Sequence, residues 1–414
     1  MIYDIELSNL YSIKENIVFS MEATATNVKR QNYIELSDDE HKCLKVGIIY
    51  GPNASGKTNL LKALDNLKDI IMYSNNIPEE QGVLQYLPFY LHEDTASRPS
   101  KIVVRLVLDA EISAVYRYSI SYDSSMIIEE TLSREEKGKE DFLFKREIQV
   151  DGTHSVVLED GIKDTELPQK QVRKNQAILS YLQALNVPYV TDVALALTQK
   201  LQLANNYNPN MQNKLWEDAK RLIANNPKYR DRLDEFLRRV GTGVNGFLVP
   251  DKDAAMNTLT FKHQQKTHLG DYTPILFNQY LESLGTRTLF LLGVKIIEAL
   301  DKGYTLFVDE LDSPFHTYIT QYIIKMFQDE RLNKKHAQLI MTTHDVQLMN
   351  ERQLRLDQIW LMDKQEDSSS SLVSLADFKD VDENTRIAEW YMAKRFGGVP
   401  DIEPLITLFQ DETD

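Results

Sequence analysis

The stretch "GPNASGKT" at residues 51–58 limits what this chain can fold into more than any other part of the sequence. It fits the pattern G-x-x-x-x-G-K-[ST] and follows the apolar run "LKVGIIY" at 44–50. In such a loop, glycines allow successive backbone N–H groups to converge on phosphate oxygens at a helix N-terminus. Apolar residues recur at helical spacing over 57–73. The sequence therefore predicts a strand, a phosphate-binding loop and a helix, in that order.

The loop predicts that the chain binds ATP together with Mg²⁺. We expect Lys57 to neutralise the β- and γ-phosphates, and the hydroxyl of Thr58 to ligate Mg²⁺. The residues predicted to contact the nucleotide, in the loop and directly after it, are Gly51, Asn53, Ser55, Gly56, Lys57, Thr58 and Asn59.

A second motif supplies the carboxylates that ATP hydrolysis requires. The strand-like run "YTLFVDELD" contains Asp309 and Glu310 at its end. Because Mg²⁺ needs a second anchor and the attacking water needs a general base, we assign Asp309 to the metal and Glu310 to the water. His344 follows the apolar run "LIMTT" and is predicted to hydrogen-bond the γ-phosphate or the water. The predicted catalytic residues are therefore Glu310, His344 and Lys57.

The order of patterns along the chain predicts an α/β fold built on a P-loop NTPase core. Apolar strands alternate with helical segments in a way that is typical of a parallel sheet with crossover helices. Between them lie hairpin patterns, with a D-G turn at 151–152, and a stretch at 168–240 that looks helical. The predicted divisions are an N-terminal half of the core with the loop, a β-rich lobe, a helical insertion and a C-terminal half of the core, at 1–83, 84–165, 166–245 and 246–414.

A further stretch, "LESLGTRTLF" at 281–290, bears on the class of ATPase. Ser283 and Gly285 stand at the start of a predicted helix, and 309 − 285 = 24 residues separate Gly285 from Asp309. Taken alone, a serine or glycine there is an ordinary helix cap. In combination with the phosphate loop, "FVDELD" and "TTHD", the stretch resembles the signature Ser-x-Gly of ABC-class ATPases of the SMC and OLD type.

The resemblance spans nearly the whole chain and is more specific in two places. The stretches "FLRRVGTGVNGF" and "YMAKRFGGVPDI" are similar to the compact ATPase subunits of two-gene phage-defence and abortive-infection systems, such as the RloA-like and PARIS-type ATPases. This likeness implies an ABC-ATPase-like core that carries a β-rich lobe and an inserted helical lobe.

In that class, the signature of one subunit caps the ATP that is held on the loop of another. The resemblance therefore implies a homodimer or higher oligomer, in which Ser283 and Gly285 contact the partner's nucleotide and Asp312 links the two sites across the interface. Two features depart from the pattern. The signature reads Ser-Leu-Gly-Thr rather than Ser-Gly-Gly, and Gln81 and Gln85 are only weak candidates for the glutamine between the sheet and the β-lobe.

Composition restricts the partners and the location. The formal net charge of −15 argues against a surface that is basic everywhere, so DNA binding is not indicated, although a local basic groove at 27–32 or 228–240 stays open. No window approaches 18 uninterrupted apolar residues, and the start lacks the layout of a signal peptide. These features predict a cytoplasmic protein that does not enter the membrane. The single cysteine, Cys43, is expected to be a small buried residue.

The chain has little room for a second activity of its own. It lacks the sustained heptads of SMC arms, and only 414 − 344 = 70 residues follow His344, too few for the nuclease domain of OLD-type proteins. Asp380 and Asp382 are interpreted as loop acids rather than as a metal site. We therefore expect any nuclease or toxin activity to reside in a separate effector protein.

Two functions remain open. In the first, an oligomeric ATPase senses infection through a phage-derived trigger and controls the effector. In the second, an SMC-like ATPase of DNA repair or recombination clamps duplex DNA between two ATPase heads. The acidic balance and the lack of a coiled coil favour the first.

Overall fold

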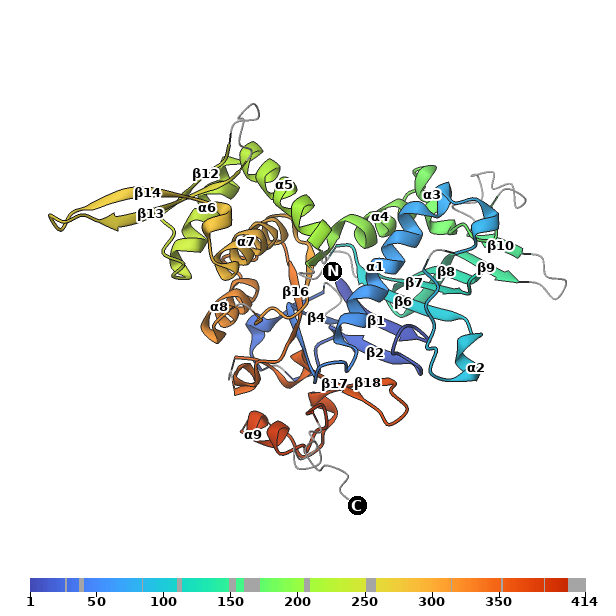
Figure 1. Ribbon diagram of the computed structural model, residues 1–414. Coiled ribbons are helices and arrows are strands. Elements are labelled where there is room, and N and C mark those ends of the chain that lie inside the picture. Colours follow the sequence, from blue (N-terminus) through green and yellow to red (C-terminus); the bar gives the residue numbers. More distant parts are fainter. Residues whose placement is uncertain are drawn as a thin grey trace, which may run out of the picture.

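The computed structural model shows an α/β protein in which a mainly parallel sheet and an antiparallel sheet pack around shared helices (Figure 1). The predicted D-G turn at 151–152 and the final residues 401–414 lie outside the described part of the chain. The structure describes residues 1–26, 28–36, 41–83, 85–109, 114–148, 154–159, 172–204, 209–250, 258–313, 315–350, 353–382 and 384–400.

The central sheet is the predicted ATPase core. All neighbouring strands in it are parallel except the last pair, β17 and β18. Strands β5, β15 and β16 are wholly buried, as their continuous apolar runs predict, and their carboxyl ends meet at one edge. In order across the sheet, the strands are β11 (Leu201–Ala204), β15 (Thr305–Val308), β16 (Gln338–Thr343), β5 (Val46–Tyr50), β17 (Ile359–Lys364) and β18 (Ser370–Ser374). This arrangement confirms the predicted α/β P-loop fold class.

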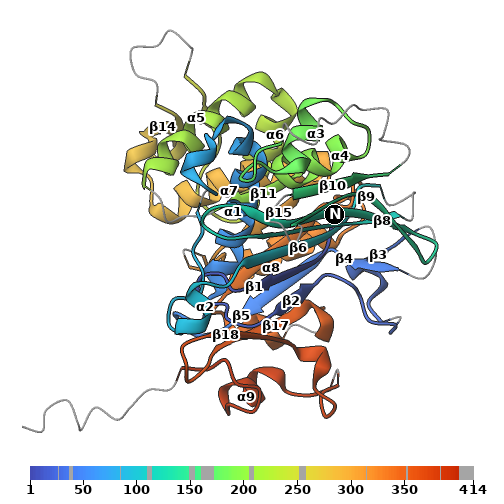
Figure 2. The ribbon, with the colours of Figure 1, turned by 90° about the vertical axis from the view of Figure 1, so that its right-hand side faces the viewer.

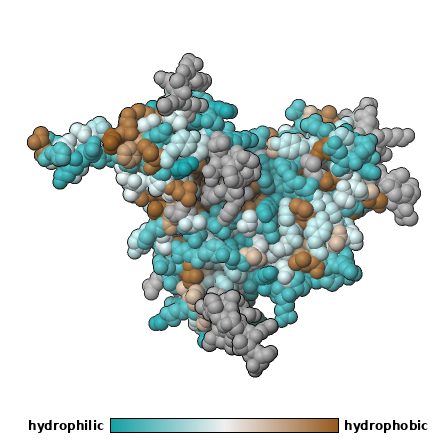
Figure 3. All heavy atoms as spheres, in the orientation of Figure 1, coloured by the Kyte–Doolittle hydropathy of each residue, from teal (hydrophilic) through white to brown (hydrophobic). Residues whose placement is uncertain are grey.

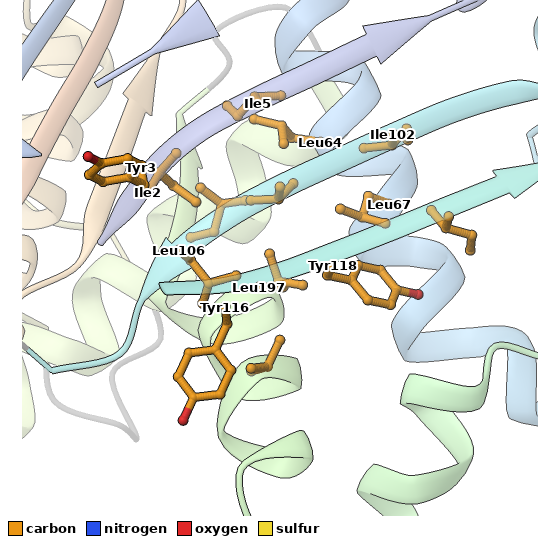
Figure 4. Packing of buried hydrophobic residues seen from close by; sticks show 14 of the residues in the cluster. Ile2, Tyr3, Ile5, Leu64, Leu67, Ile102, Leu106, Tyr116, Tyr118 and Leu197 are labelled. Carbon is orange, nitrogen blue, oxygen red and sulfur yellow. The ribbon is translucent and has the colours of Figure 1, made fainter. Parts of the chain in front are cut away.

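The second sheet is antiparallel and forms the β-rich lobe. Helix α1 (Lys57–Tyr73) packs against it, so that Leu64 and Leu67 lie among side chains of β1 and β6 such as Ile5 and Ile102 (Figure 4). In order across the sheet, the strands are β10 (His154–Leu158), β9 (Lys139–Ile148), β8 (Ile127–Glu136), β7 (Ala114–Tyr122), β6 (Ser100–Val107), β1 (Ile2–Ser8) and β2 (Ile17–Ser20).

A buried glutamine joins the two sheets. Gln338, at the start of β16, accepts a hydrogen bond from Ile2 N at 2.6 Å and donates to Ile2 O at 2.9 Å and Leu44 O at 3.0 Å. Because a buried amide without partners would be costly, this network fixes β1 relative to the core. Cys43 is fully buried beside it, as the sequence predicts, and burial raises the pKa of its thiol to about 12.

The stretch predicted to be helical at 168–240 contains helices and one strand of the core. Helices α3 (Ile178–Ala184) and α4 (Val190–Leu195) pack with α1 and the β-lobe. Strand β11 then pairs in parallel with β15; at four residues it is too short to show an alternating pattern. Helices α5 (Pro209–Asn225) and α6 (Pro227–Arg239) pack on α7 (Leu284–Lys302).

A β-hairpin arm projects from the body of the molecule beside α6 (Figures 1 and 3). It is formed by β13 (Thr260–Lys266) and β14 (Tyr272–Asn278), with the short β12 (Phe247–Leu248) at its base. At the base, the rings of Phe247 and Phe261 meet Phe290 of α7 edge to face. Pro274 lies within β14 and pairs with Gln264 of β13; a proline inside a strand weakens its sequence pattern.

The remaining elements are short. Figures 1 and 2 place α5 and α6 at one end of the molecule and α9 (Ile387–Met392) at the other. Among the described residues, no helix is long and apolar enough to cross a membrane. The other elements are α2 (Glu93–Ala96), α8 (Thr317–Gln328), β3 (Tyr33–Glu35), β4 (Lys42–Leu44), a π-type turn (Ala196–Lys200) and 3-10 turns at Arg30–Asn32, Ser74–Asn76, Glu79–Gln81, Gln279–Leu281, Val346–Asn350, Leu356–Gln358 and Leu375–Asp377.

Candidate nucleotide site

The phosphate-binding loop connects the carboxyl end of β5 to the N-terminus of α1, as the sequence predicts. Gly56 has a φ of 107°, a backbone conformation that residues with a side chain rarely adopt. A Cβ there would lie 2.2 Å from Ser370 Oγ. At Gly51, a Cβ would lie 2.2 Å from the carbonyl oxygen of Met362. Both positions therefore require glycine, because the loop packs directly on β17 and β18.

Lys57 is buried with its ammonium group inside the loop. Its Nζ donates to Gly51 O at 2.8 Å and to Pro52 O at 2.9 Å, and the residue is 5% exposed. Burial lowers the pKa of Lys57, and the nearby carboxylate of Glu310 partly opposes that effect. A bound phosphate would supply the anionic partner that the loop carbonyls only replace in part.

Thr58, Asp309 and Thr342 join three elements in one hydrogen-bonded chain. Thr58 Oγ1 donates to Asp309 Oδ2 at 2.8 Å, and Thr342 Oγ1 donates to Asp309 Oδ1 at 2.5 Å. Asp309 is fully buried at the end of β15. A hydroxyl and a carboxylate oxygen beside a phosphate loop are the ligand set that fits Mg²⁺, which takes few protein ligands and completes its shell with phosphate and water.

Glu310 has a backbone conformation that is unusual for its residue type. Its φ is 47°, in the left-handed region, and its N–H donates to Thr342 Oγ1 at 2.7 Å. Its side chain is 31% exposed, and Oε1 lies 3.7 Å from His344 Nε2. Strained positions of this kind persist where the surroundings hold them, often at functional sites. The strain here turns the carboxylate toward His344, at the ends of neighbouring parallel strands.

Asp312 is tied to the same edge. Its carboxylate accepts a hydrogen bond from the backbone N–H of His344, at 3.2 Å to Oδ2. The structure thus brings five of the predicted residues to one place at the sheet edge: Lys57, Thr58, Asp309, Glu310 and His344, with Asp312 beside them.

The other predicted loop residues differ in their surroundings. Asn53 is exposed, whereas Ser55 is fully buried and its Oγ has no hydrogen-bond partner among the described residues. Asn59 Nδ2 donates to Ser12 Oγ at 2.7 Å, and that hydroxyl lies 2.7 Å from Ser370 Oγ. Ser370 Oγ in turn donates to Ser55 O at 2.6 Å.

Sequence reasoning did not identify Ser12, Thr342 or Ser370 as parts of the site. Ser370 belongs to a serine run that is typical of a surface loop, and Ser12 lies in an isolated turn far from the loop along the chain. Thr342 stands in the quoted "TTHD", so its place at the end of an apolar strand was the one available signal. Of the weak candidates, Gln81 is exposed and Gln85 donates to Asp69; among the described residues, neither forms a hydrogen bond with this network.

The signature residues stand at the start of α7. Ser283 caps α7, accepting a hydrogen bond from Thr286 N at 3.1 Å, and Gly285 lies in the first turn. Within the described residues, no hydrogen bond or ion pair links either of them to residues 51–58. The capping serine is exposed, and three large apolar neighbours are more than 60% exposed: Tyr280, Leu281 and Leu284.

Comparison with known proteins adds a family. A family model described as "AAA domain, putative AbiEii toxin, Type IV TA system" matches residues 48–350. Among solved structures, the SMC head domain from Thermotoga maritima is 13% identical, with a TM-score of 0.39 over 90% of this chain and 98% of that chain. An Smc head domain with an extended coiled coil bound to the C-terminal domain of ScpA, derived from Pyrococcus furiosus, is 12% identical, with a TM-score of 0.42 over 91% and 97%. No curated protein matches the sequence significantly.

Proposed function

The chain belongs to the AAA-domain family of the AbiEii-toxin type, and on this premise we propose that it hydrolyses ATP at composite sites formed between two copies of itself. One observation carries the proposal: the chain of hydrogen bonds from Thr58 through Asp309 and Thr342 to Glu310. It connects the residues for metal binding to the residue for water activation across three adjacent elements.

Each side chain has a task that its position suits. ATP supplies the phosphoryl group, and Mg²⁺ bound with it would neutralise part of the negative charge of the phosphates. Lys57 would exchange the loop carbonyls for phosphate oxygens, and Thr58 and Asp309 would hold the metal. The Glu310 carboxylate accepts a proton from the attacking water, and His344, 3.7 Å away, donates a hydrogen bond that orients the water or stabilises the γ-phosphate.

The signature residues support a site shared between two copies. Ser283 and Gly285 lie at the N-terminus of the long helix α7, where the helix dipole favours an anion. Among the described residues, neither forms a hydrogen bond or ion pair with the loop of its own chain. The exposed Tyr280, Leu281 and Leu284 around them form a surface that we call the signature surface. Large apolar side chains exposed together are typical of an interaction site, and a second copy carrying ATP is the partner we propose.

At the level of biology, we propose that ATP-dependent closure of these dimers controls a separate effector, a nuclease or toxin, in cytoplasmic defence against phage. The family description names a putative toxin of a Type IV TA system, which supports a role of this chain in a system of that kind. A two-state assembly that responds to a phage-derived trigger would suit such control. Purification of the tagged chain together with its neighbouring gene product tests this part: a stable complex is expected, and its absence contradicts the effector role.

The alternative DNA-engaging role makes a different prediction. A clamp on duplex DNA requires an affinity that falls steeply with salt and rises with ATP. Finding both would replace the effector role with the DNA role while leaving the ATPase proposal intact.

The rate of phosphate release tests the ATPase proposal itself. Because a composite site needs two chains, the rate per chain should rise with protein concentration until the dimer is complete. A rate per chain that does not depend on concentration, from a protein that stays monomeric, would contradict the shared site. No release of phosphate above the background rate would contradict the enzyme activity.

A further inference from the structure

A hollow lined by basic side chains lies at the amino edge of the parallel sheet, opposite the nucleotide site. It has a volume of about 310 Å³, and the N-terminus, marked N in Figures 1 and 2, borders it. Lys200, Lys302 and His336 come within three residues before the starts of β11, β15 and β16, respectively. The basic residues are Lys200, Lys302, Lys334, Lys335 and His336, and we call this hollow the basic pocket.

The charge of the basic pocket runs against that of the whole chain. The chain has a formal net charge of −15, yet Asp109 is the one acidic side chain among the described residues that line the pocket. Lys302 has its own partner, Glu298, at 2.6 Å. Within the described residues, Lys200, Lys334 and Lys335 form no ion pair.

The basic pocket contains more lysines than are needed to offset the partial negative charge at the C-terminus of α7. The C-terminus of α7 reaches the pocket, and its carbonyl end favours a cation. Lys302 in the last turn already meets that need, and Gly303 N and Tyr304 N close the helix by donating to Ala299 O. Among the described residues that line the pocket, Asp109 is the only carboxylate that could offset the mutual repulsion of the remaining lysines.

Hydrogen bonds and close packing fix the backbone of the loop between α8 and β16, which carries Lys334 and Lys335. Asn333 is 2% exposed; its side chain donates to Phe327 O and Ala337 O at 2.7 and 2.8 Å, and accepts from Ala337 N at 2.7 Å. Gly303, with φ of 74°, packs so closely that a Cβ there would lie 2.4 Å from Lys335 O. The backbone positions of Lys334 and Lys335 are thus set by packing rather than by their charges.

His336 adds a polar group that lacks a partner. Its φ is 58°, an unusual conformation for a histidine, and its buried Nδ1 has no hydrogen-bond partner among the described residues. Burial, followed by the charge of the nearby Lys45, lowers the pKa of this ring. Buried polar atoms usually have a hydrogen-bond partner. A ring nitrogen without one, beside lysines that form no ion pair in the described part of the chain, is therefore typical of a site that binds a ligand.

We propose that the basic pocket binds a phosphate-bearing ligand, independently of the nucleotide site. Its volume lies at the lower end of the roughly 300–1,000 Å³ that is usual for small-molecule sites, so it fits one or two phosphate groups rather than a large body. Lysines act as point charges toward phosphate, and an unpaired ring nitrogen supplies a directed hydrogen bond. The phosphates come either from a small free ligand or from the backbone of a nucleic acid strand.

The test compares two charge-matched variants of the full chain. Lys334→Glu with Lys335→Glu changes the pocket, whereas Lys364→Glu with Lys379→Glu changes exposed lysines elsewhere. Each pair lowers the formal net charge by 4, so long-range effects are equal. Both are made in a Lys57→Ala background, which removes phosphate binding at the nucleotide loop from the comparison.

Binding of inorganic pyrophosphate and of a short single-stranded oligothymidylate is measured by calorimetry at two salt concentrations. The proposal predicts at least a tenfold weaker affinity in the pocket variant than in the control variant, for at least one probe, with a smaller difference at higher salt. Pyrophosphate binding identifies a small ligand, and binding of the oligonucleotide alone identifies a nucleic acid backbone. Equal affinities in the two variants, or no binding of either probe to the control variant, would overturn the proposal.

Discussion

At the scale of single residues, Lys57 is the first point at which the nucleotide site can be tested. Its ammonium group is buried on two loop carbonyls, so its removal deletes the main charge that faces the phosphates. Hydrogen bonds to charged groups contribute about 1.5–3 kcal/mol, so Lys57→Ala should weaken ATP binding by at least tenfold in calorimetry. Lys62→Ala, an exposed lysine on the same helix, is the control and should bind ATP normally. Unchanged ATP affinity in Lys57→Ala would rule out the loop assignment.

Glu310 separates binding from turnover. Gln keeps the size of the side chain and cannot accept the proton of the attacking water, and a positioned base contributes about 10²–10⁴-fold to a rate. Glu310→Gln should therefore bind ATP with parental affinity and release phosphate at least a hundredfold more slowly. Turnover at the parental rate would exclude Glu310 as the base.

The reactivity of Cys43 tests the packing around Gln338, which joins the two sheets. The thiol is fully buried and burial raises its pKa to about 12, and the thiolate is the reactive form. The native protein should therefore resist alkylation by iodoacetamide at pH 8, while the protein in denaturant should be labelled fully. Rapid labelling of the folded protein would contradict the packing at this place.

At the scale of elements, the base of the hairpin arm is anchored by aromatic rings on α7. Phe290 is fully buried and meets the rings of Trp216, Phe247 and Phe261. Truncating such a residue costs about 3–5 kcal/mol, so Phe290→Ala should lower the free energy of unfolding by that amount in denaturant titration. Leu269 lies in the turn of the arm and is 91% exposed. Leu269→Ala should change the free energy of unfolding by less than about 0.5 kcal/mol. Similar effects of the two changes would contradict the described packing.

The signature surface is also a property of an element, the N-terminal turn of α7 and the residues before it. Leu284 is 67% exposed there, and Leu91 is 70% exposed at a position that is not part of this surface. Leu284→Asp should leave ATP binding unchanged but reduce phosphate release at least tenfold, because it places a charge in the proposed interface. Leu91→Asp should behave as the parent does. Equal phosphate release by the two variants would mean that the signature surface is not used.

At the scale of the whole molecule, the sequence predicts the long apolar strands of the core and the residues that follow them better than it predicts short strands and contacts between distant segments. The loop, the acidic strand end and the strand before His344 were predictable, because buried parallel strands are continuous apolar runs and the chemistry follows at their carboxyl ends. β11 was not predictable, since four residues carry no period. The contacts of Ser12 and Ser370 were hidden as well, because 358 residues separate them along the chain.

The assembly is the central claim, because each ATP site depends on it. Glu310→Gln should trap the closed state, since it binds ATP without releasing phosphate, so we would measure the mass of this variant by light scattering with and without ATP and Mg²⁺. The chain has a mass of 47.8 kDa. The account predicts a shift to at least twice that mass, 2 × 47.8 = 95.6 kDa, only when ATP is present, and the loss of the shift when Leu284→Asp is added. A mass of 47.8 kDa with ATP bound at saturation would contradict it.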